Sequence, residues 1–116
     1  MYSVTQAFVE WLVAKGYDAH TYPPSDAPDE FATVERTGGN VSDLVDHATI
    51  AVQTWALTEA DAEEAAITIR DALLTGERPD GVARVDADAG PYPFWDESTG
   101  RARYQTVYTA HCILVD

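Results

Sequence analysis

The sequence predicts an α+β fold: a mostly antiparallel sheet of four to five strands with two helices packed on one face, in the order α-β-β-β-α-β-β. Two segments carry apolar side chains at helical spacing, whereas five others are extended or alternate between apolar and polar residues as strands do. The turns between consecutive strands are short, which favours antiparallel pairing. A length of 116 residues suits a single domain over residues 1–116.

The first helix is expected over residues 3–15. Ser3 and Gln6 stand at capping-box spacing, and Thr5 is an alternative cap. Gly16 is placed to end the helix in a left-handed conformation. The apolar stripe at helical spacing that would face the sheet comprises Val4, Ala7, Phe8, Trp11 and Leu12.

The second helix is expected to begin after Thr58, which together with Asp61 resembles a capping box, and to end at Gly76 and Pro79. Acidic residues crowd its first turn, where the positive end of the helix dipole stabilises them. Its many alanines would let the helix lie close to a sheet. The expected buried stripe comprises Ala62, Ala65, Ala66, Ile69, Ala72 and Leu73.

Three extended segments are expected before the second helix, over residues 17–22, 31–36 and 47–57. An acidic loop with three prolines, residues 23–30, separates the first two. Thr37-Gly38-Gly39-Asn40 is typical of a turn, which residues 41–46 could continue. Residues 47–57 alternate cleanly and would form a strand roughly 35 Å long. Such a strand would reach beyond the core of so small a domain.

Two more strands are expected after the second helix, over residues 82–87 and 101–115, with a long loop at 88–100 between them. The last strand alternates between an apolar face and a more polar one. Cys112 falls on the more apolar face, where we expect it to pack as a small hydrophobic residue.

The charge of the chain excludes some classes of partner. Seven Lys and Arg against 20 Asp and Glu leave a net charge of −13. Only Arg101 and Arg103 would share a strand face, so sequence-specific binding of nucleic acid is not expected. No apolar run is long enough to span a membrane, so we expect no membrane partner. Glu10 interrupts the N-terminal apolar stretch, which therefore does not resemble a signal peptide, and we expect an intracellular protein. The acidity leaves three interpretations open: solubility alone, a surface that does not adhere to passing DNA, or a mimic of DNA.

A search for catalytic and binding chemistry finds no site. None of the three histidines, His20, His47 and His111, has a second His or Cys at metal-ligand spacing, apart from the adjacent pair His111-Cys112. That pair cannot share a ligand, because neighbouring residues on a strand point to opposite faces. One cysteine allows no internal disulfide. Nucleophile elbows, phosphate-binding glycine loops and dinucleotide fingerprints are absent. We therefore expect no catalytic residue, no cofactor and no metal, and a protein that is not an enzyme.

Surplus aromatic residues are the most informative feature for function. Tyr92, Phe94 and Trp95 crowd into the expected loop, and Trp55 falls on the more polar face of the long strand. Two interpretations of the loop stay open: its aromatics fold back as a lid on the core, or they contact another protein. The candidate interface residues are Trp55, Tyr92, Phe94 and Trp95. A neighbouring subunit would also stabilise apolar residues on the sheet face without helices, namely Trp55, Leu57, Val107 and Ile113.

Several motifs, in order along the chain, carry a family resemblance. They are the leading helix with Phe8, Trp11 and Leu12, the loop end Pro28-Asp29-Glu30-Phe31, the stretch Thr33-Val34-Glu35-Arg36-Thr37-Gly38-Gly39, the strand end Ala56-Leu57-Thr58 before an alanine-rich helix, Ala89-Gly90-Pro91-Tyr92, and a closing strand with Tyr104 and Tyr108. Through them nearly the whole chain resembles the tail terminator (tail completion) proteins of long-tailed bacteriophages, in the form common in actinobacterial prophages.

The resemblance implies a structural protein that forms a homo-hexameric ring on the head-proximal end of the tail tube. Such a ring stops polymerisation of the major tail tube protein and offers a surface to the head-tail connector protein. It belongs to the tail or neck of the virion, and to the host cytoplasm during assembly. The resemblance brings no catalytic or cofactor-binding residues. An acidic lumen would let DNA pass without adhering. Two alternatives stay open: a head-side connector or adaptor of the neck and, in another class, an acidic inhibitor that mimics DNA.

Overall fold

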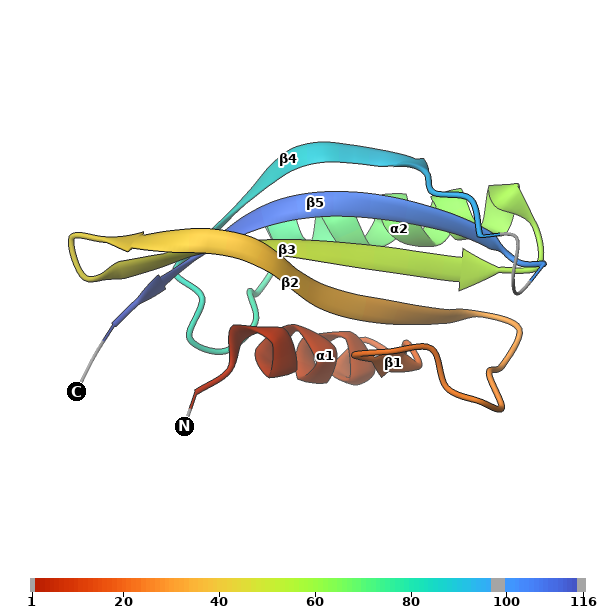
Figure 1. Ribbon diagram of the computed structural model, residues 1–116, viewed down its shortest axis with the longest axis horizontal. Helices are drawn as coiled ribbons and strands as arrows, with labels where there is room; N and C mark the ends of the chain where they lie inside the picture. The colour runs from red at the N-terminus through yellow and green to blue at the C-terminus, as the bar shows by residue number, and fades with distance from the viewer. Residues whose placement is uncertain (1, 97–99, 115–116) are drawn as a thin grey trace.

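The protein folds as a five-stranded sheet with two helices against it, as seen in a computed structural model that describes residues 2–96 and 100–114 (Figure 1). In chain order the elements are α1 (Val4–Ala14), β1 (Ala19–His20), β2 (Phe31–Ser42), β3 (Val45–Ala56), α2 (Glu59–Thr75), β4 (Arg84–Pro93) and β5 (Ala102–Ile113). This order confirms the predicted α+β fold.

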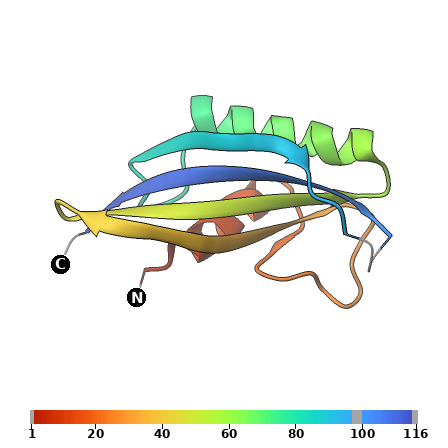
Figure 2. The ribbon, with the colours of Figure 1, turned by 45° about the horizontal axis from the view of Figure 1, so that its top comes forward.

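The strand order in the sheet is β1-β2-β3-β5-β4. Neighbouring strands are antiparallel except for β1, which pairs with β2 in parallel over two residues. The three long strands β2, β3 and β5 form the middle, where Val52 lies between Val34 and Thr106. Both helices cover the same face: α1 contacts β1 and β2, and α2 contacts β3, β4 and β5 (Figure 2). The opposite face, which we call the open face, carries no helix.

The start signals of both helices act as predicted. The Ser3 hydroxyl accepts a hydrogen bond from the backbone N–H of Gln6, and the Thr58 hydroxyl accepts one from the backbone N–H of Asp61. Gly16 follows α1 with a φ of +99°, which glycine adopts without a steric penalty. Local capping chemistry therefore sets where the two helices begin and where α1 ends.

The core lies between the helices and the sheet. Phe8 and Leu12 of α1 and Ile69 of α2 pack with Ile50 and Tyr108 of the central strands, and all five are at most 1% exposed. Burying a large apolar side chain stabilises the folded state by roughly 1.5–3 kcal/mol. Alternate residues of β5 are buried against the helices, as the sequence predicts. The described strand ends at Ile113, and residue 115 of the predicted strand lies outside the described residues.

The turn between β2 and β3 does not lie at residues 37–40, where we expected it. β2 continues to Ser42, and the chain reverses at Asp43 and Leu44, whose φ angles are +52° and +62°. Two consecutive positive φ values match the two-residue hairpin turn whose twist fits flanking strands. That turn favours Asn, Asp or Gly, so the leucine at its second position hid it from the sequence pattern.

Gly38 and Gly39, which suggested a turn at residues 37–40, instead lie at a β-bulge inside β2. The register with β3 shifts between Arg36 and Gly38. At Gly39 the φ is +125°, and a Cβ would lie 2.2 Å from the backbone oxygen of His47. Only glycine fits there, because both the backbone conformation and the close approach of β3 exclude a side chain.

We expected a strand that ends at residue 87 and a loop over 88–100, but β4 continues to Pro93. Its pairing with β5 shifts register on either side of Ala89. Because β4 lies at the edge of the sheet, it tolerates prolines that a central strand would not. The predicted loop also includes residues 97–99, which lie outside the described residues.

Candidate functional site

The middle of the open face is a ladder of side-chain hydrogen bonds that crosses four strands. Thr33 donates to Gln53 (2.7 Å), Gln53 donates to Gln105 (2.7 Å), and Gln105 donates to the hydroxyl of Tyr92 (2.6 Å). Gln53 is only 6% exposed, so these bonds offset the cost of removing its amide from water. The centre of this face is therefore polar, as the sequence indicated when it placed Gln53 and Trp55 on the more polar face of the long strand.

Trp55 lies inside the subunit, at one end of this ladder. It is 3% exposed, its ring stacks on Phe31 at 5.2 Å, and its indole N–H donates to the Thr33 hydroxyl. The guanidinium of Arg103 lies 4.6 Å from the Trp55 ring and 4.2 Å from the Phe94 ring. Trp55 thus supports the neighbouring surface and offers almost no contact area of its own.

Arg103 also holds the backbone that follows β4. Its guanidinium donates to the carbonyl oxygens of Phe94 (2.7 Å) and Trp95 (3.2 Å). Phe94 and Trp95 are 39% and 65% exposed, and Tyr22 and Leu57 are exposed close by at the same end of the sheet. We call Tyr22, Leu57, Phe94 and Trp95 the aromatic end. Of the predicted interface residues, Phe94 and Trp95 form its surface.

A second exposed apolar group lies at the opposite end of the sheet, where the β2–β3 hairpin projects past the helices (Figure 1). We call this group the arm; its members are Val41, Leu44, Ile113 and Leu114, which are between 47% and 72% exposed. The backbone N–H of Leu114 donates to the carbonyl of Leu44, which ties the hairpin turn to the end of β5. The sequence did not indicate the arm, because the turn was expected at residues 37–40, with residues 41–46 as its possible continuation.

Leu44 is the most informative residue of the arm. Its φ of +62° lies in the left-handed region, which costs an ordinary side chain roughly 1–2 kcal/mol, and its side chain is 72% exposed. Asparagine or glycine would fit this turn better and expose less apolar surface. The leucine therefore stabilises neither the turn nor the core, and a contact with another molecule would explain it.

An ion pair stabilises the base of the arm. Arg36 donates two hydrogen bonds of 2.8 Å to the two carboxylate oxygens of Asp46, across the strands β2 and β3. These hydrogen bonds hold the pKa of Asp46 below its ordinary value. A carboxyl group with a lowered folded-state pKa adds stability above its unfolded pKa, and that stability is lost as the pH falls through the folded value.

We expect Asp46→Asn to lower the free energy of unfolding by about 1 kcal/mol at neutral pH, because the bidentate pair is lost. The difference from the wild type should shrink as the pH falls through the lowered folded-state pKa of Asp46, because the carboxyl group is then protonated in both states. Urea titrations from neutral pH downward measure it. Asp43→Asn on the exposed turn is the control, and a difference that stays constant with pH would contradict the assignment.

Two histidines that the sequence separates lie side by side on the open face. His47 on β3 pairs directly with His111 on β5, and their Nδ1 atoms are 2.7 Å apart. The Nε2 atom of His111 lies 2.8 Å from Asp86, and the Nε2 atom of His47 lies 3.0 Å from the hydroxyl of Ser42. We expected no paired histidines, because the sequence spacing does not reveal the register of β3 on β5.

Cys112 takes no part in this group. It points to the opposite face, is 3% exposed, and belongs to the main core cluster. Burial raises the pKa of its thiol, which disfavours the reactive thiolate. Its surroundings agree with the expected packing role.

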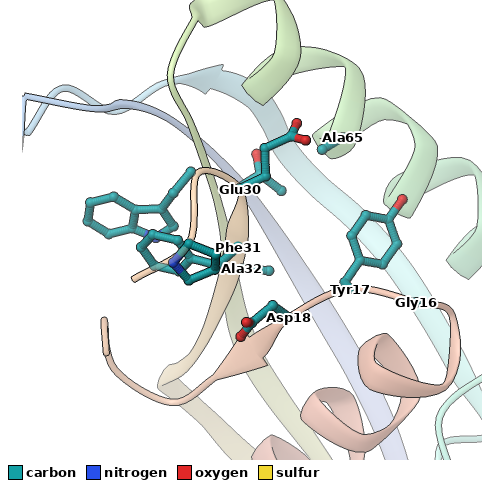
Figure 3. A pocket seen from close by; sticks show the side chains of 10 residues that line it. Gly16, Tyr17, Asp18, Glu30, Phe31, Ala32 and Ala65 are labelled. Carbon is teal, nitrogen blue, oxygen red and sulfur yellow. The ribbon is translucent and has the colours of Figure 1, made fainter. Parts of the chain in front are cut away.

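A cavity of about 340 Å³ opens where the end of α1 meets the start of β2 and the middle of α2 (Figure 3). Its lining includes Tyr17, Asp18, Glu30 and Phe31. Burial, with a smaller effect of the Glu30 charge, raises the pKa of Tyr17. None of the ten lining residues is a serine, cysteine, histidine or lysine. The cavity offers carboxylates beside aromatic surface, without a nucleophile of the serine or cysteine type.

A scan against models of known protein families and a search of curated protein sequences found no match for this chain. None of the helices among the described residues has the length and apolar character needed to cross a membrane. The function is therefore inferred from the sequence resemblance and from the geometry of the two exposed ends.

Proposed function

We propose that this protein is a structural, non-enzymatic subunit of a phage or prophage tail. Six copies form a ring that caps the head-proximal end of the tail tube, ends polymerisation of the tube protein, and offers the surface for joining the head. The observation that carries this proposal is the presence of two different apolar groups at opposite ends of one elongated subunit. The principal extents of the subunit are 43 × 25 × 24 Å.

The placement of the two groups favours a head-to-tail contact. In a two-fold dimer every contact is returned by the partner, whereas a contact between two different patches that is not returned repeats around a ring or along a filament. The arm is aliphatic and projects past the helices, whereas the aromatic end is a mostly aromatic surface held by Arg103. In the proposed ring the arm of each subunit packs on the aromatic end of the next.

The charge of the chain fits a ring through which DNA passes. A net charge of −13 per subunit repels phosphates, so DNA would slide through an acidic lumen without adhering. This part of the proposal is tested separately, by mapping acidic residues on a structure of the assembled ring. A neutral or basic lumen would remove it.

The experiment that tests the function measures assembly with and without tail tubes of the same phage or prophage. Native mass spectrometry should find a hexamer of about 76 kDa, six times the 12.7 kDa of the chain, at high concentration or after tubes are added. Electron microscopy should show tubes that are capped at one end and stop growing. Capping of isolated heads in place of tubes would favour a head-side connector. A monomer that ignores tubes and displaces DNA from a DNA-binding protein would favour a DNA mimic.

A further inference from the structure

We propose that His47 and His111 bind a divalent transition-metal ion of the zinc and copper type through their Nδ1 atoms. This site lies next to the arm, because Ser42 is flanked along β2 by Val41, but it does not depend on the proposed role in a phage tail. The inference rests on the facing ring nitrogens, on the partners of the outer nitrogens, and on the charge of the neighbouring edge strand.

The two imidazoles converge because their residues are directly opposite each other on adjacent antiparallel strands. The ring centroids are 4.9 Å apart, and the rings meet edge to face at 79°. Two bonds of about 2.0–2.1 Å at a tetrahedral ion would place the nitrogens about 3.3 Å apart. The Nδ1 atoms are already 2.7 Å apart, so the side chains need to separate by only about 0.6 Å to admit the ion.

The outer nitrogen of each ring already has the kind of partner that metal-bound histidines use. His111 Nε2 lies 2.8 Å from a carboxylate oxygen of Asp86, and His47 Nε2 lies 3.0 Å from the hydroxyl of Ser42. Such partners fix the orientation of the ring and raise the basicity of the coordinating nitrogen. Without Asp86 and Ser42 the two imidazole rings would rotate more freely and would chelate an ion less well.

Asp86, His111, His47 and Ser42 form a continuous series of hydrogen bonds, and the groups at its two ends determine where the protons lie. Asp86 accepts a hydrogen bond from His111 Nε2, which leaves His111 Nδ1 as an acceptor for the Nδ1–H of His47. His47 Nε2 then accepts from the Ser42 hydroxyl. On metal binding the His47 proton moves from Nδ1 to Nε2, where Ser42 turns to accept it. Both rings stay neutral, both Nδ1 lone pairs face the ion, and no proton is released.

The charges around the pair favour a cation. Asp86 contacts His111, and Asp88 accepts a hydrogen bond from Thr109 on the same face. Arg84 pairs with Asp86 and opposes this effect in part, although its side chain is 70% exposed and so is well screened by water. The described residues contain no group of three or more His, Cys, Asp and Glu placed to hold a metal. Water would therefore complete the coordination, which makes this an open site.

Calorimetric titration of the purified protein with zinc chloride tests the proposal. We expect one ion per chain, and His47→Gln and His111→Gln should each weaken binding at least tenfold. Asp86→Asn, which leaves both ligands in place, should weaken it by about 10–100-fold. The matched control is His20→Gln on β1, which should bind zinc as the wild type does. Circular dichroism verifies that each variant is folded.

A spectroscopic measurement identifies the ligands directly. Copper(II) added to the wild type should give an electron paramagnetic resonance spectrum with coupling to two imidazole nitrogens, and His47→Gln or His111→Gln should reduce this to one. Zinc or copper binding that is unchanged in the His47→Gln/His111→Gln double variant would overturn the proposal. So would a wild-type chain that binds neither ion.

Discussion

Trp55→Ala is expected to lower the free energy of unfolding by about 3–5 kcal/mol, the usual cost of truncating a buried tryptophan. The ring is 3% exposed, stacks on Phe31, and lies beside the guanidinium of Arg103. Its removal leaves a cavity, deprives the Thr33 hydroxyl of a donor, and loosens the arginine that holds the aromatic end. Urea unfolding followed by circular dichroism measures the change.

The control for this prediction is another tryptophan of the same chain. Trp95 is 65% exposed, so Trp95→Ala should alter the free energy of unfolding by no more than about 0.5 kcal/mol. The same variant should weaken assembly, because Trp95 contributes the largest side chain of the aromatic end. Equal losses of stability in Trp55→Ala and Trp95→Ala would show that the two residues do not have the separate roles that we assign to them.

Leu44→Asn is expected to abolish ring formation while leaving the subunit as stable as the wild type, or more stable by up to about 1 kcal/mol. Asparagine tolerates the φ of +62° better than leucine does, and it removes the most exposed apolar side chain of the arm. Native mass spectrometry in the presence of tubes measures assembly, and urea unfolding measures stability.

A matched substitution separates this effect from a general loss of apolar surface. Leu74 on α2 is 46% exposed, and Leu74→Gln removes a leucine of the same size from a helix that tolerates glutamine. We expect this control to assemble normally. If Leu44→Asn also assembles normally, the arm has no part in the contact between subunits.

Local signals predicted the helices and the alternation of the central strands well, because those features depend on residues close in sequence. Ser3 and Thr58 cap their helices as expected, and β5 alternates as expected. The predicted position of the turn between β2 and β3 was wrong for a physical reason. Gly38-Gly39 has the composition of a turn but serves a bulge, whereas Leu44 occupies a turn position that its own conformational preference opposes.

The candidate sites depended on pairing between strands, which the sequence pattern leaves undetermined. Residues 47 and 111 become neighbours only through the register of β3 on β5. The sequence placed Trp55 on the correct face of the sheet. It did not show that Phe31 and Arg103 cover the Trp55 ring and leave little of it exposed. Phe94 and Trp95 stood out in the sequence because three aromatic residues crowd into one short segment, and the structure leaves both side chains exposed.

The most direct test of the head-to-tail contact uses disulfide cross-linking between subunits in the presence of tubes. The variant Leu44→Cys/Trp95→Cys should form disulfide-linked species up to a closed hexamer under mild oxidation, and Cys112 is too deeply buried to interfere. Each single variant should stay uncross-linked, and a mixture of the two should give linked dimers. Efficient linking of Leu44→Cys to itself, with none between residues 44 and 95, would contradict the account.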